Sequence, residues 1–170
     1  TNEEVPGQVF VQLGTVQQGS LVADCTLPGA RLLRGETPMV AVHRIMETKL
    51  YGVQQNISIE SLVRESESKD SGVDWLEKIY LRTVAHSIMC GPFPAPTVRV
   101  RRPTDIPLEE AYVVHNPQHG RIVLYGWVQR SYYYFLKTAE GEHALQNWLS
   151  LLEMDECGQQ TLGHKLVLRF

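Results

Sequence analysis

The middle of the chain constrains the fold most, because it contains signals for both the start and the end of a helix. Ser71 and Asp74 match the S-x-x-D capping pattern, in which the serine oxygen accepts an early backbone N–H and the carboxylate lies at the positive end of the helix dipole. One apolar stripe at helical spacing overlaps this start and continues beyond it, made of Val73, Leu76, Tyr80, Val84 and Ile88. Gly91 and Pro92 end the pattern. These signals predict a buried helix from Ser71 to Cys90.

The N-terminal half of the chain is mainly strand-like. Apolar and polar residues alternate over 8–13 and 21–27, with the period of two expected for strands. The run 39–46 is rich in Val, Ile and Met and is bounded by turn-forming residues, so it predicts a strand central to the fold. Apolar residues at helical spacing predict a short helix over 58–63, and the charged segment 64–70 predicts a solvated helix end and loop.

The C-terminal half predicts further strands and one more helix. A basic strand is expected over 97–102, and the run 111–137 predicts a β-hairpin with a loop at 115–120 and a long second strand. Thr138 is a suitable cap for a helix that Gly158 would end. The buried stripe of this helix would be Leu145, Trp148, Leu149 and Leu152. Alternation predicts a final strand over 162–170.

Length and composition favour a single α+β domain. The 170 residues are enough to bury a sizeable core, and 43% apolar with 21% charged residues is ordinary for a globular protein. The elements above predict a mainly antiparallel sheet packed with about three helices, over residues 14–170. Residues 1–13 are expected to form an N-terminal arm or an edge strand. No apolar run approaches the ~20 residues that a membrane-spanning helix needs.

Charge and cysteine content exclude some functional classes. A net charge of −3 argues against a wholly basic nucleic-acid-binding domain, although it permits a local basic patch. Cys25, Cys90 and Cys157 are odd in number and far apart, so they predict neither a disulfide framework nor a cysteine-rich zinc site. A reducing compartment fits this pattern best.

The histidines and Cys90 are the candidates for metal binding or catalysis. His115 and His119 have a zinc-like spacing but lie in a predicted Pro- and Gly-containing turn without a third ligand, so we expect no bound metal. Cys90 lies one helical turn after His86 in the predicted helix, yet the pair carries no recognisable nucleophile motif. No cofactor, small-molecule substrate or catalytic residue is therefore predicted. A cytosolic enzyme using His115, His119 or Cys90 is kept as an alternative.

The arginines of the basic strand are the best candidates for binding an anionic partner. Alternation places Arg99 and Arg101 on one strand face, and Arg102 follows. Such a cluster attracts the phosphates of lipid headgroups or of a nucleoprotein. The competing interpretation is a solvated face whose arginines pair with nearby carboxylates, namely Asp105, Glu109 or Glu110.

The aromatic run Tyr132-Tyr133-Tyr134-Phe135 allows a different function. Aromatic residues on a strand can stack single-stranded bases, so together with the arginines they support the alternative of a single-stranded-RNA-binding protein. Consecutive strand residues project to both faces, however, and aromatics bury much area. The favoured interpretation is that these side chains serve two packed layers of the core.

The order of the predicted elements resembles the globular domain of rhabdovirus matrix proteins. The matching elements are the strand 39–50, the helices from Ser58 and Ser71, the connector 91–96, the β-rich stretch 98–137, the helix 144–157 and the strand 162–170. The chain lacks the lysine-rich N-terminal arm and the P-P-x-Y motif of that family, which suits a plant-infecting or divergent member.

The resemblance implies a structural protein with no enzymatic activity. It would self-associate, condense the helical viral nucleocapsid and link it to the anionic inner surface of the envelope. Its expected locations are the virion and the host cytoplasm, peripheral at membranes. In the matrix proteins an N-terminal segment links copies, so the resemblance assigns self-association to the corresponding apolar residues Val5, Val9, Val11 and Leu13.

Overall fold

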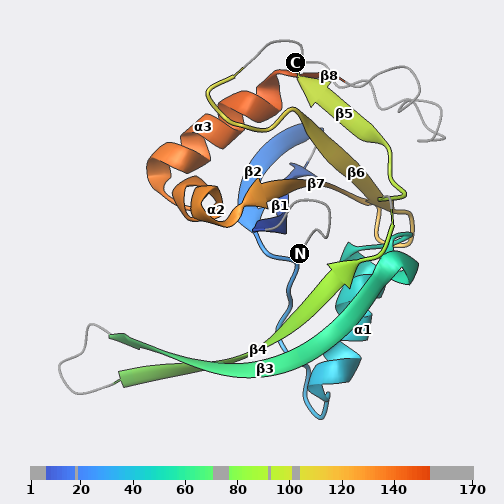
Figure 1. The fold of residues 1–170 in the computed structure, drawn as a ribbon, viewed down its shortest axis with the longest axis vertical. Helices are drawn as coiled ribbons and strands as arrows, with labels where there is room; N and C mark the ends of the chain where they lie inside the picture. The colour runs from blue at the N-terminus through green and yellow to red at the C-terminus, as the bar shows by residue number, and fades with distance from the viewer. Residues whose placement is uncertain (1–6, 18, 71–76, 92, 101–103, 154–170) are drawn as a thin grey trace.

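A six-stranded antiparallel sheet forms the centre of the fold, and a separate two-stranded arm projects from it (Figure 1). The computed structural model describes residues 7–17, 19–70, 77–91, 93–100 and 104–153. The sheet has the order β2-β1-β7-β6-β5-β8. Its strands are β1 (Gln8–Gln17), β2 (Ser20–Thr26), β5 (Thr97–Val100), β6 (Glu110–Asn116), β7 (Arg121–Gln129) and β8 (Leu152–Glu153). The α+β class and the mainly antiparallel sheet predicted from the sequence are confirmed.

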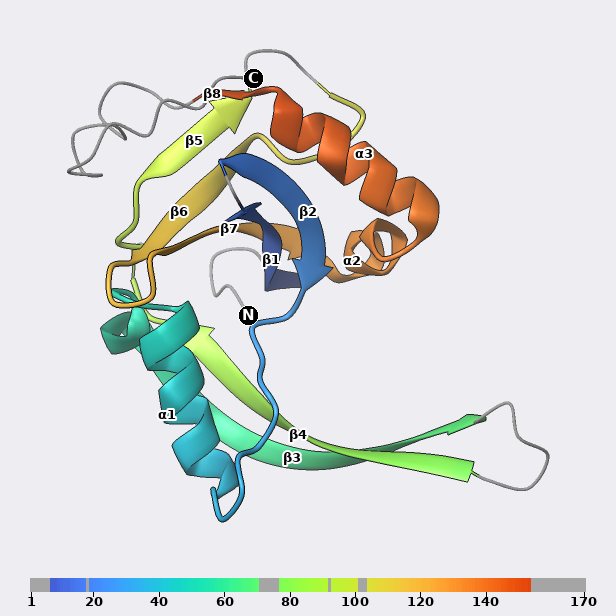
Figure 2. The same cartoon turned by 180° about the vertical axis from the view of Figure 1, so that it is seen from behind.

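Three α-helices and one short 3-10 helix accompany the strands of the described chain. They are α1 (Pro38–Lys49), the 3-10 helix η1 (Gln54–Asn56), α2 (Arg130–Leu136) and α3 (Ala139–Ser150). The two-stranded arm consists of β3 (Ile57–Asp70) and β4 (Glu77–Met89), which pair antiparallel along almost their whole length. Figures 1 and 2 show α2 and α3 near one face of the sheet and α1 beside the arm.

The main core lies between the sheet and helices α2 and α3. Val11 and Leu13 of β1 and Leu145 and Leu149 of α3 have no accessible surface. Trp148 is also buried there, and its indole N–H donates a hydrogen bond of 2.8 Å to the carbonyl of Leu108. Because a buried indole N–H needs an acceptor, this bond fixes the loop before β6 against α3.

A second, smaller core covers the opposite face of the sheet. It contains Leu50 and Val53, which follow α1, together with Tyr125 of β7. Phe10 stacks on Tyr125 with ring centroids 5.1 Å apart, and Phe93 lies 4.7 Å from Phe10. The segment after the arm therefore returns to the sheet through an aromatic contact.

Side chains of the sheet hold the C-terminal end of α1. The Asn116 amide donates to the carbonyls of Thr48 at 3.0 Å and Glu47 at 3.4 Å, and the Tyr125 hydroxyl donates to the carbonyl of Lys49 at 3.0 Å. The last carbonyls of a helix lack partners within the helix, so these bonds satisfy groups that would otherwise be unpaired. Burial raises the pKa of Tyr125, which keeps its hydroxyl protonated and able to donate.

Strand β2 is an edge of the sheet, and a side chain of α3 covers part of this edge. The Gln146 amide nitrogen donates to the carbonyl of Leu21 at 3.0 Å, and its oxygen accepts from the N–H of Ala23 at 2.9 Å. These are the two backbone groups that an additional strand would use. The side-chain amide thus takes the place of one peptide unit of a neighbouring strand.

Several elements predicted from the sequence are confirmed. Strands β1 and β2 and the hairpin of β6 and β7 lie where alternation placed them. Thr138 caps α3, because its hydroxyl accepts the N–H of Gly141 at 3.1 Å. The helix ends at Ser150, so Leu152 belongs to β8 and not to the helix stripe. The predicted helix end at Gly158 is therefore wrong, and the predicted strand at 162–170 lies outside the described residues.

Two predicted helices are wrong, because residues 57–70 form β3, residues 77–89 form β4, and these two strands pair with each other. The spacing of Tyr80, Val84 and Ile88 is four, which places residues on one side of a helix but equally on one face of a strand. The intervening positions carry further strand-forming residues such as Ile79 and Leu81, and cross-strand pairing decides the outcome. The predicted cap at Ser71 and Asp74 lies outside the described residues.

The predicted strand at 39–46 is also wrong, because this segment is helix α1. The Thr37 hydroxyl accepts the N–H of Val40 at 3.4 Å, and Pro38 occupies the first turn. This pair is a helix start, since proline tolerates the first helical position and threonine is a good cap. Likewise the second hairpin strand ends at Gln129, and residues 130–136 form α2.

The expectation of an exposed segment at residues 1–13 is wrong for the part that the structure describes. Strand β1 pairs with both β2 and β7, so it is an interior strand. Val11 and Leu13 are buried and Val9 packs against the same core, so these side chains are not available to a neighbouring copy. Val5 lies outside the described residues.

We expect the Asn116→Ala substitution to lower the free energy of unfolding by about 1–3 kcal/mol, because it leaves two buried carbonyls of α1 without their donor. Urea denaturation measures this change. Gln118→Ala in the adjacent turn is the control, because its exposed side chain should change stability by less than ~0.5 kcal/mol. Equal stability of the two variants would show that the bonds from Asn116 do not stabilise the fold.

Candidate interaction surfaces

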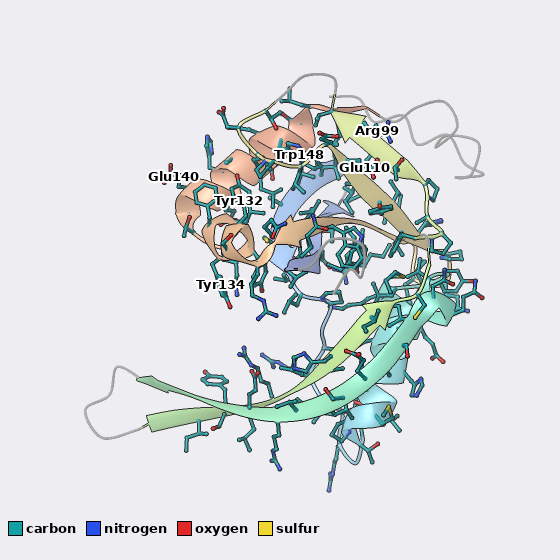
Figure 3. The ribbon with its side chains drawn as sticks, in the orientation of Figure 1. Arg99, Glu110, Tyr132, Tyr134, Glu140 and Trp148 are labelled. Atoms are coloured by element: carbon teal, nitrogen blue, oxygen red, sulfur yellow. The ribbon has the colours of Figure 1, made fainter. Side chains whose placement is uncertain are left out.

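Arg99 is exposed on β5 and is engaged by a carboxylate of the neighbouring strand (Figure 3). Its guanidinium lies 3.0 Å from the Glu110 carboxylate, and its Nε donates a hydrogen bond of 3.1 Å to the same oxygen. The two residues face each other directly across β5 and β6. This contact is the one that the solvated-face interpretation predicts. Arg101 and Arg102 lie outside the described residues, so binding of an anionic partner by the three arginines stays a prediction.

The aromatic run at 132–135 lies in a helix and not in a strand. Tyr133 is buried, and Tyr132 and Phe135 pack against the main core. The ring centroids of Tyr132 and Phe135 are 5.1 Å apart. Burial raises the pKa of Tyr132. Only Tyr134 is largely exposed, and it points away from the body (Figure 3). Most of the run therefore belongs to the core, and it does not offer consecutive rings for stacking bases.

The candidate catalytic and metal-binding residues are dispersed. His115 is exposed on β6, His119 is exposed in the turn that follows, and Cys90 is exposed just after β4. Within the described ranges, no group of three or more His, Cys, Asp or Glu residues lies close enough to hold a metal ion. Cys25 is partly buried, and burial raises the pKa of its thiol to about 11, which makes it a poor nucleophile at neutral pH.

The two-stranded arm exposes aliphatic side chains on one face. Leu81 lies opposite Ser66 and Leu62 lies opposite Ala85, which places both leucines on the same face as Ile79. Ile79 is 65% exposed and Leu81 is 61% exposed. We call Leu62, Ile79 and Leu81 the arm face. The exposed Arg64 lies on the same side of the arm, opposite Thr83, and sequence analysis missed this surface.

The opposite face of the arm is more polar. Arg82 and Glu65 form an ion pair across the strands, with the guanidinium Nε 2.6 Å from the carboxylate. Val63 lies on this second face, because the register places it opposite Val84. The two faces of the arm therefore differ in character, and a partner that prefers aliphatic contacts would select the arm face.

A second exposed aliphatic surface lies in the loop before α1 and in the first turn of the helix. Leu32, Leu33, Met39 and Val40 are 41% to 59% exposed. The two leucines stand between Arg31 and Arg34 in the sequence. We call these four aliphatic residues the apolar tip. The only sequence signal for it is the Arg-Leu-Leu-Arg run in a segment otherwise expected to be a turn.

The loop of the apolar tip is held in place by one carboxylate. Glu36 accepts hydrogen bonds from Arg44 at 2.7 and 2.8 Å and from the N–H of Leu33 at 2.8 Å. Arg44 also donates to the carbonyl of Arg31 at 3.0 Å. The hydrogen bond from Arg44, followed by that from Leu33, lowers the pKa of Glu36 from its usual 4.5 to about 2. The carboxylate is therefore ionised and engaged at neutral pH.

Comparisons with known proteins found no match for this chain. No family model, no curated protein and no solved structure matches the chain. Within the described part of the chain, no helix combines the length and apolar character needed to cross a bilayer. The functional argument therefore rests on the two exposed aliphatic surfaces.

We expect the Glu36 carboxylate to titrate with a midpoint near pH 2 in the folded protein and at a higher pH in the Arg44→Gln variant, still below 4.5 because the N–H of Leu33 also lowers the pKa. A carboxylate with a lowered pKa stabilises the fold fully above the unfolded pKa, and this contribution is lost as the pH falls from about 4.5 to 2. Carbon-detected NMR of the glutamate carboxyls measures both midpoints. An ordinary midpoint in the parent protein would show that the contact with Arg44 is not formed in solution.

Proposed function

We propose that this protein is a self-associating structural protein of the viral matrix type. Copies join through the two-stranded arm, and the resulting layer condenses a helical nucleocapsid and links it to an anionic membrane. It acts in the virion and in the host cytoplasm, peripheral at membranes. The observation that carries the proposal is the projecting arm with its exposed aliphatic face. The nucleocapsid and membrane roles come from the sequence-based resemblance to rhabdovirus matrix proteins, whose expected element order differs from the observed one at α1, β3 and β4.

The arm favours association because its outer part is poorly supported within one copy. A two-stranded ribbon is marginally stable in water unless a further strand or helix packs on it. Over the described residues, β3 and β4 form a sheet of two strands only. Figure 2 shows the outer part of the arm extending away from both the sheet and α1. A partner that covers Ile79 and Leu81 would therefore stabilise the arm as well as the complex.

The arm face is self-complementary in size. Ile79 and Leu81 are the large side chains of β4 on this face, while the residue directly opposite Leu81 on β3 is Ser66. A second arm related by a two-fold axis can place a large β4 side chain over this small position. Such a contact uses the same patch on both copies, which is the commonest arrangement in homo-oligomers. This contact is complete once two copies have joined, so further contacts between the pairs build the layer.

The expected strength of this contact is modest. Burying the exposed parts of Leu62, Ile79 and Leu81 contributes ~1–2 kcal/mol each, or ~6–12 kcal/mol for two copies. Association costs ~4–15 kcal/mol in lost freedom of motion, so the contact alone gives weak, concentration-dependent pairs. Repetition of weak contacts on one layer then makes the assembly cooperative.

We expect the double substitution Ile79→Ser with Leu81→Ser to weaken self-association by at least ~100-fold, because it removes two exposed aliphatic side chains from each copy. Sedimentation velocity over a range of protein concentrations at low salt measures the effect. Val63→Ser is the matched control, since it removes an exposed aliphatic side chain from the opposite face and should leave association unchanged.

Thermal unfolding separates loss of association from loss of folding. The variant should keep the unfolding midpoint of the monomeric parent, because the substituted side chains are exposed in the single copy. A parent protein that stays monomeric at millimolar concentration would refute the proposal. So would a double variant that associates as strongly as the parent.

A further inference from the structure

The apolar tip is unusual because it combines exposed aliphatic side chains with a fixed backbone. Leu32 and Leu33 are more than half exposed, although the loop that presents them is tied by Glu36 and Arg44. The N–H of Glu36 also donates to the carbonyl of Leu33 at 3.0 Å, which closes a turn behind the leucines. The loop is thus built to keep these side chains in solvent. Such an arrangement is explained by a partner that receives them.

The position of the tip suits contact with a broad surface. Figures 1 and 2 show the N-terminal end of α1 and its preceding loop at the end of the helix farthest from the sheet. The C-terminal end of α1 is the end that Asn116 and Tyr125 hold against the sheet. The helix therefore carries the tip outward from the body on a rigid support.

The charge around the tip is positive. Arg31 and Arg34 are exposed, and neither forms an ion pair with any residue that the structure describes. The nearest carboxylate in the sequence, Glu36, is occupied by Arg44. Arg99 differs, because Glu110 neutralises it. The two arginines that flank the leucines are thus placed to meet an anionic surface beside the aliphatic side chains.

We infer that the apolar tip is the membrane-contact site of this protein and binds the surface of an anionic lipid bilayer. Leu32, Leu33, Met39 and Val40 enter the boundary between headgroups and acyl chains, and Arg31 and Arg34 contact anionic headgroups. The inference rests on the proposed function in one respect, since a matrix-type layer has a membrane to contact. It does not require the two-stranded arm.

The composition of the tip favours lipid over a protein partner. The four residues of the tip are aliphatic, and Arg31 and Arg34 beside them form no ion pair with a described residue. Aliphatic side chains with flanking basic residues are typical of peripheral membrane contacts. Each arginine near an anionic membrane contributes a factor of about five in binding, so two arginines predict a preference of about 25-fold for anionic over neutral bilayers.

Vesicle flotation tests the inference with two lipid compositions, phosphatidylcholine alone and phosphatidylcholine with 30 mol% phosphatidylserine. The parent should bind the anionic vesicles more tightly, and Leu32→Ser with Leu33→Ser should reduce binding to both compositions by at least ~10-fold. Arg31→Gln with Arg34→Gln should reduce binding to the anionic vesicles by about 25-fold and leave binding to the neutral vesicles unchanged. Protein is used at a concentration at which sedimentation shows monomers.

The arm variant Ile79→Ser with Leu81→Ser is the matched control, because it also removes two exposed aliphatic side chains. It should lose self-association and keep vesicle binding, whereas the leucine variant of the tip should do the reverse. Failure of the proposed function and failure of this inference are therefore distinguishable. Vesicle binding that is absent in the parent, or unchanged in both tip variants, would overturn the inference. A tip variant that loses self-association instead would show that the tip is an interface between copies.

Discussion

The hydrogen bonds from Asn116 and Tyr125 to the last carbonyls of α1 position the rest of the molecule. They fix one end of the helix to the sheet, so the other end and its loop are carried outward in a defined direction. The chain then passes through η1 into β3, so the root of the arm lies beside the same anchor. Both exposed aliphatic surfaces thus take their placement from polar contacts within the fold.

The parts of the fold that were predicted correctly are those where local pattern and tertiary environment agree. The hairpin of β6 and β7 alternates regularly, and α3 has a strong cap at Thr138 followed by residues that pack on the sheet. The arm could not be predicted in this way, because its residues satisfy helical and strand spacing equally and pairing between β3 and β4 decides between them. The prediction for α1 was wrong because Thr37 and Pro38 were interpreted as a strand boundary, whereas they form the start of a helix.

The candidate surfaces were harder to predict than the fold, because exposure is a property of tertiary structure. Strand alternation predicts that Arg99 is exposed. Its partner Glu110 was one of three nearby acids that the sequence offered. Ile79 and Leu81 lie off the apolar stripe of the predicted helix, so the sequence pattern assigned them no role, and their exposure follows from the pairing of β3 and β4. The Arg-Leu-Leu-Arg run carried the only local hint of exposure, since basic residues on both sides are uncommon in a core segment.

The amide of Gln146 that covers the edge of β2 has a consequence for how the protein tolerates changes in chain length. Successive residues of an α-helix are rotated by about 100° around its axis. A single residue deleted between the cap at Thr138 and Gln146 would therefore turn the amide away from Leu21 and Ala23 and leave their backbone groups open. An unpaired stretch of an edge strand can pair with a strand from another molecule. The length of one helical segment thus determines whether this part of the β2 edge is covered within a single copy.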